Sequence, residues 1–95
     1  MVTKEEVIQI LKEYVDPELM IDVWTLGLIY EITISSENAV RILITFTSPL
    51  CPYGPAMLRD LTDLIKAKGA KEVEMEVTFE PPWKPSDEVR EMLGV

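Results

Sequence analysis

The sequence predicts an α/β (α+β) fold: a two-layer sandwich with helices on one face of a mixed three-stranded sheet. Two patterns predict this class. Apolar residues recur at helical spacing in three segments and alternate with polar residues in three others, in the order helix, strand, strand, helix, strand, helix. A strand, helix and strand in succession normally form a right-handed crossover, so the last two strands should be parallel, and the hairpin before them antiparallel. At 95 residues, 47% of them hydrophobic, the chain is expected to form a single domain over residues 1–95.

The first helix is expected to begin after Thr3. Thr3 and Glu6 have the spacing of a capping box, in which each side chain satisfies a free amide at the helix start. Asp16-Pro17 should stop the helix near Tyr14, because proline disfavours helical geometry in the preceding residue. Its apolar positions are Val7, Ile8, Leu11, Tyr14 and Val15.

An ordered loop and a hairpin are expected next. Residues 16–27 have no clean period, but they contain apolar residues that can anchor a loop to the core. Residues 28–34 and 40–46 both alternate, and the turn formers of 35–38 lie between them. The expected loop anchors are Leu19, Ile21, Val23, Trp24 and Leu26.

The second half of the chain predicts a helix, a strand and a short helix. Met57, Leu61, Leu64 and Ile65 form a helical stripe, which Gly69 follows. Residues 73–79 alternate as a strand with one wet face, and Pro81-Pro82 should end it. Ser86 can cap the last helix.

Composition excludes several classes of function. A formal net charge of −8 disfavours nucleic acid as a partner, because that binding needs an excess of Lys and Arg; solubility or a basic protein partner accounts for the acidity. No apolar run approaches the roughly 20 residues that span a bilayer, and the acidic N-terminus lacks the pattern of a signal peptide. With a single cysteine, the chain is expected to be a reduced cytoplasmic protein that does not bind membranes.

Cys51 lies in the segment 47–52, which joins a predicted strand to a predicted helix, where α/β folds often collect binding groups. If Pro52 or Pro55 fills the first helical position, unpaired helix amides beside Cys51 would favour its thiolate, a nucleophile and soft metal ligand. The alternative is a buried cysteine that packs as a small apolar side chain.

The rest of the sequence limits what Cys51 can do. With no histidine and no second cysteine, the chain cannot form a Cys-His pair or a dithiol, so we expect that it is not an enzyme of either kind. One cysteine also cannot hold an iron-sulfur cluster, which needs about four ligands, or a zinc ion. A partner chain, a second subunit or a small thiol would have to complete any such site.

Two other features are candidates for binding. The acids of residues 16–22 could bind a hard cation or act in acid-base chemistry, although loop acids are more often solvated or capping groups. Trp83 lies in a proline-rich segment, where it would be a core anchor or a partner contact. The loop acids in question are Asp16, Glu18 and Asp22.

Four motifs in order resemble the MIP18 family, the DUF59 group that includes SufT-like and PaaD-like proteins, over almost the whole chain. They are Asp16-Pro17-Glu18, Leu26-Gly27-Leu28-Ile29-Tyr30, Thr47-Ser48-Pro49-Leu50-Cys51-Pro52 and Pro81-Pro82-Trp83-Lys84-Pro85. The resemblance implies a compact α/β fold and a role in maturing iron-sulfur proteins. It makes Cys51 the main site residue and metal ligand, with Asp22, Thr47 and Ser48 as further site positions.

The sequence departs from the family pattern at two positions. Thr25 stands where Asp or Asn commonly precedes Leu-Gly, and Glu80 stands where Asp often precedes Pro-Pro-Trp. Neither departure touches Cys51.

Three functions remain open from the sequence. The favoured one is an assembly factor that passes, holds or helps to insert a transient iron-sulfur cluster through Cys51. Its expected partners are carrier or scaffold proteins and apo-protein clients, and a second copy of the chain could share the cluster. The others are a PaaD-like accessory subunit of a multicomponent oxygenase and an enzyme that uses Cys51 alone.

Overall fold

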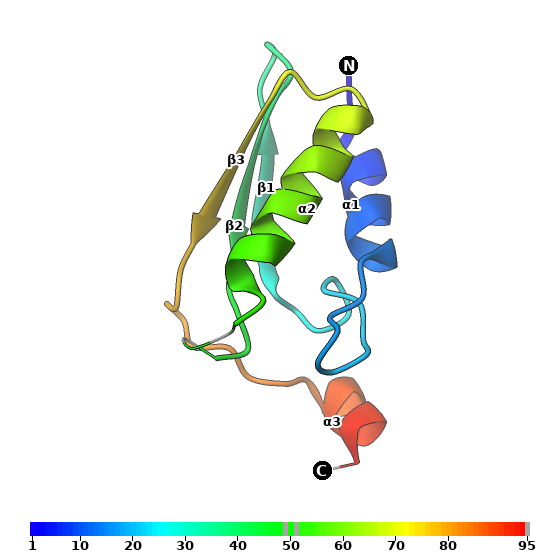
Figure 1. The fold of residues 1–95 in the computed structure, drawn as a ribbon, viewed down its shortest axis with the longest axis vertical. Coiled ribbons are helices and arrows are strands. Elements are labelled where there is room, and N and C mark those ends of the chain that lie inside the picture. Colours follow the sequence, from blue (N-terminus) through cyan, green and yellow to red (C-terminus); the bar gives the residue numbers. More distant parts are fainter. Residues whose placement is uncertain (49, 51, 95) are drawn as a thin grey trace.

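Two helices lie against one face of a three-stranded sheet in the computed structural model, which describes residues 1–48, 50 and 52–94 (Figure 1). The helices are α1 (Lys4–Glu13) and α2 (Gly54–Ala67), and the strands are β1 (Ile29–Ile34), β2 (Ala39–Ile44) and β3 (Glu72–Val77). The short α3 (Asp87–Leu93) lies at one end of the molecule. The predicted fold class and order of elements are confirmed.

The sheet has the order β1-β2-β3 and the predicted mixed topology. β1 is antiparallel to β2, with Ile32 opposite Ile42, and β2 is parallel to β3, with Ile42 opposite Met75. Since side chains alternate along a strand, Val40, Ile42 and Ile44 all face the helices. The buried core joins these three residues to Val7 and Leu11 of α1 and to Met57, Leu61 and Ile65 of α2.

The two helices on the sheet begin differently. α1 has the predicted capping box, in which Glu6 N donates to Thr3 Oγ1 and Thr3 N donates to Glu6 Oε1. For α2, Gly54 is the first helical residue and Pro55 the second, so a proline lies in the first turn but one position later than the condition considered for Cys51. Proline is tolerated there because amides of the first turn have no partner within the helix.

β2 and β3 end two residues earlier than predicted. They stop at Ile44 and Val77, although the alternation of apolar residues continues to Phe46 and Phe79. Beyond the strands, the two phenylalanine rings pack edge to face, with centroids 6.3 Å apart. The apolar alternation therefore continues past the ladder because these rings pack on each other outside it.

Residues 14–28 form the expected anchored loop. Ile21, Val23 and Leu26 are buried, and Leu19 and Trp24 pack partly against the core. Backbone hydrogen bonds close the loop on itself, from Asp16 N to Ile21 O and from Val23 N to Tyr14 O.

The other face of the sheet has no helix on it in the part of the chain described here (Figure 1). β3 presents Glu72, Glu74 and Glu76 there, all exposed, and Arg41 of β2 forms ion pairs with Glu74 and Glu76. This outer face is consequently wet and acidic. Among the described residues, no helix combines the length and apolar character needed to span a membrane.

Candidate functional site

The segment that contains the central predicted residue joins β2 to α2. Cys51, Pro49 and Val95 lie outside the described residues. Of the residues around Cys51, Thr47 is half-buried and Ser48 is exposed. Ser48 Oγ accepts a hydrogen bond from Leu50 N at 3.2 Å, a local turn that uses the hydroxyl oxygen as acceptor and leaves its proton to donate elsewhere.

A contact between Phe46 and Gly54 closes the base of this loop. A Cβ atom on Gly54 would lie 2.8 Å from Cε2 and 2.9 Å from Cζ of the Phe46 ring, so only glycine fits without displacing the ring. The residues immediately before and after positions 47–53 therefore touch, as in compact surface loops with closely spaced ends. The fold fixes where the loop starts and ends.

The loop acids mainly organise backbone. Asp16 is only 3% exposed, and its Oδ1 accepts hydrogen bonds from Glu18 N at 2.7 Å and Leu19 N at 3.0 Å. Asp22 Oδ2 accepts one from Thr25 N at 2.9 Å. Over residues 1–48, 50 and 52–94, no group of three or more His, Cys, Asp or Glu is placed to hold a metal ion. Asp16 and Asp22 thus have the capping role weighed as the alternative to cation binding.

The hydroxyl of Tyr14 links residues 14–28 to α2, a role that its place in the apolar pattern of the first helix did not indicate. Tyr14, at the end of α1, donates its hydroxyl proton to Asp60 Oδ2 at 2.7 Å. Desolvation, followed by the hydrogen bond and the negative charges of Asp60 and Asp16, raises the pKa of Tyr14 to about 12. No local pattern signals this pair, because its members are 46 residues apart.

The proline-rich segment 81–85 is fixed at two points. Trp83 Nε1 donates to Leu26 O at 2.7 Å, and its ring packs against the core. Tyr30 donates its hydroxyl proton to Pro81 O at 2.8 Å. Trp83 is therefore a core anchor, and the structure joins the Leu26-Gly27 motif to the Pro-Pro-Trp motif.

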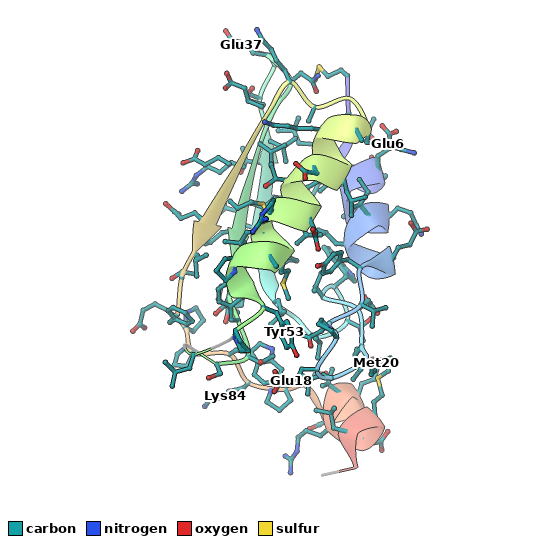
Figure 2. All side chains as sticks on the ribbon, in the orientation of Figure 1. Glu6, Glu18, Met20, Glu37, Tyr53 and Lys84 are labelled. Atoms are coloured by element: carbon teal, nitrogen blue, oxygen red, sulfur yellow. The ribbon has the colours of Figure 1, made fainter. Side chains whose placement is uncertain are left out.

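Three segments that are far apart in the sequence meet at one end of the molecule: the loop of residues 14–28, the loop between β2 and α2, and the proline-rich segment 81–85. Figure 2 shows Glu18, Tyr53 and Lys84, one from each segment, at the end where α3 also lies. Directly after β2, Thr45 is fully buried, and its Oγ1 has no hydrogen-bond partner among residues 1–48, 50 and 52–94. Its amide donates to Leu28 O at 2.8 Å, which holds the start of the loop against the end of residues 14–28.

The fold and this site define a small α/β domain with one cysteine in its sequence, and one thiol cannot by itself supply the roughly four ligands of an iron-sulfur cluster. A family model described as "Iron-sulfur cluster assembly protein" matches residues 4–78, and the chain belongs to this family. The resemblance to the MIP18 or DUF59 group is thereby confirmed.

Individual proteins agree with this assignment. The chain is 34% identical over 82 residues to the Fe-S protein maturation auxiliary factor of Porphyromonas gingivalis, covering 85% of this chain and 78% of that protein. The structure of the conserved hypothetical protein TM0487 from Thermotoga maritima superposes with a TM-score of 0.85 at 47% identity, over 99% of this chain and 96% of that one. An iron-sulfur cluster carrier protein of Synechocystis is 30% identical over 95 residues, which are 99% of this chain and 27% of the carrier.

Proposed function

We propose that this chain assists the maturation of iron-sulfur proteins by offering Cys51 as one ligand or contact to a cluster carried by a partner protein. The cluster is the cargo. The observation that carries the proposal is the match of the family model across residues 4–78, which include the only cysteine of the chain. One thiolate cannot hold a cluster that needs about four ligands, so the partner supplies the others.

The start of α2 supports a reactive Cys51. The loop leads directly into the first turn of this helix, where free amides and the helix dipole favour a nearby negative charge. With the loop closed at its base by Phe46 and Gly54, the segment that bears Cys51 starts and ends at fixed points. In the proposed site, Thr47 and Ser48 orient the thiolate or its ligand, and Asp22 and Trp83 hold the adjoining segments.

The Synechocystis carrier indicates the kind of partner. Almost the whole of this chain resembles about a quarter of that protein, so a domain of this kind forms part of a carrier there. In the proposed function, this chain meets a carrier of that kind through its surface, and the cluster moves from the carrier to an apo-protein client.

Cluster transfer from a loaded carrier to apo-aconitase tests this proposal. Purified carrier is reconstituted anaerobically with iron and sulfide, and aconitase activity is followed with and without this chain. We expect the wild type to accelerate activation and Cys51→Ser and Cys51→Ala to lose most of the acceleration while keeping the circular dichroism spectrum. Normal acceleration by both variants would remove Cys51 from the mechanism.

Reconstitution of this chain alone distinguishes a shared cluster from a contact. A visible chromophore that depends on Cys51 and appears together with dimerisation would favour a cluster shared between two copies. A colourless monomer that still accelerates transfer would favour a contact to a cluster held by the partner.

A further inference from the structure

We propose that four exposed apolar side chains around the β2-α2 loop form the docking surface for the iron-sulfur carrier. This apolar end patch consists of Leu50, Tyr53, Val77 and Phe79, whose exposed fractions are 88%, 42%, 36% and 40%. The inference rests on the proposed function, because it names the surface through which that function meets its partner.

The members of the patch come from segments that meet at the base of the loop. The Phe79 ring packs on Phe46, and the Phe46 ring abuts Gly54, the residue after Tyr53. Val77 is the last residue of β3 and pairs with Ile44, the last residue of β2. Figure 2 shows Tyr53 at this end of the molecule. A protein that covered the loop would therefore contact these side chains.

The size of the patch fits a partner that binds and leaves. Taking roughly 150–250 Å² for each of these apolar side chains, the exposed parts add up to about 300–500 Å². Patches of that size on a small protein are often functional, whereas a stable interface needs about 800 Å² from each partner. The patch is too small to hold a permanent dimer by itself, and a protein that delivers a cluster has to dissociate afterwards.

Charge selects a partner with basic residues over a second copy. Acidic residues outnumber basic ones among the exposed charges of the neighbouring segments, and the whole chain has a net charge of −8. A symmetric contact between two copies would bring the same acids together, whereas basic side chains around an apolar centre would complement them. These charges are Glu18, Glu80, Asp87, Glu88 and Glu91 against Lys84 and Arg90.

Titration calorimetry with the carrier of the same organism, loaded anaerobically with a [4Fe–4S] cluster, tests the patch. Leu50→Ser is the main variant, because a side chain that is 88% exposed contributes little to folding. Leu64→Ser is the matched control, since Leu64 is also an exposed leucine, but lies on α2 beside Ile10 and Tyr14. We expect Leu50→Ser to weaken binding about tenfold or more and Leu64→Ser to change it less than about twofold.

The outcomes separate this inference from the proposed function. We expect Cys51→Ser to bind the cluster-free carrier like the wild type yet fail in transfer. We expect Leu50→Ser to recover the wild-type transfer rate at saturating carrier. Unchanged binding by Leu50→Ser, equal losses in both leucine variants, or a wild type that does not bind the carrier would each overturn the docking surface. Sedimentation showing a dimer that Leu50→Ser dissociates would also overturn it, by making a second copy the occupant. None of these results bears on whether transfer depends on Cys51.

Discussion

Replacing Gly54 by alanine should destabilise the fold through a single collision at the base of the loop. The new Cβ would lie 2.8 Å from Cε2 of Phe46, well inside the roughly 3.5–4.0 Å of a normal carbon contact. The Phe46 ring cannot move freely, because it packs on Phe79. Overpacking of this kind costs about 1–3 kcal/mol, and the higher helix propensity of alanine returns at most about 1 kcal/mol. We expect a net loss of about 1–2 kcal/mol.

Urea denaturation followed by tryptophan fluorescence measures this loss in the free energy of unfolding. If the collision is the cause, Phe46→Leu in the same chain should remove most of the added cost, as a double-mutant cycle would show. Gly69→Ala is the control: it has open space around its Cβ but a φ of +126°, so Phe46→Leu should not relieve its cost. A Gly54→Ala variant as stable as the wild type, or a cycle without coupling, would refute the reasoning.

Three further predictions concern the segments around the loop. The pKa of Tyr14 in the folded protein is about 12, above its ordinary value of 10.0. The stability that Tyr14 contributes to the fold is therefore complete below pH 10 and is lost as the pH rises to 12. Denaturation across this range should show a steeper fall in the free energy of unfolding for the wild type than for Tyr14→Phe. Asp16→Ala should lower the free energy of unfolding by about 1–3 kcal/mol, because two backbone amides lose their acceptor at a buried site. The control Glu18→Gln should change the free energy of unfolding by under about 0.5 kcal/mol. Equal effects of the two substitutions in urea denaturation would contradict the capping role of Asp16. Trp83→Phe should cost about 1 kcal/mol or more by removing the hydrogen bond to Leu26 O, and an unchanged thermal midpoint would argue against that anchor.

Local patterns were sufficient to predict the elements and the topology. The Thr3 and Glu6 capping box and the helical stripe of α2 depend on neighbouring residues, which a sequence displays directly. The ends of the strands were harder to predict from the sequence. The alternation runs on to Phe46 and Phe79, and only the tertiary structure reveals that these rings pack on each other beyond the ladder.

The place of the Cys51 motif between two elements was predictable, whereas the hydrogen bonds and burial around it were less so. The motif that contains Cys51 falls between a strand and a helix, as expected from the patterns on either side. The burial of Asp16 and the hydrogen bond from Tyr14 to Asp60 depend on segments brought together by folding. The need for glycine at position 54 could not be predicted either, because it comes from the ring of Phe46, which lies on the other side of the loop.

The outer face of the sheet has a consequence for how crowded copies of this protein behave. Glu72, Glu74 and Glu76 form a row of like charges along an edge strand, and in the part of the chain that the structure describes Arg41 of β2 pairs with two of them, Glu74 and Glu76. Two copies that aligned these strands would set one acidic row against another, which disfavours the edge-to-edge pairing from which sheets aggregate. The same row of charges therefore opposes one route to aggregation when copies of the protein are close together.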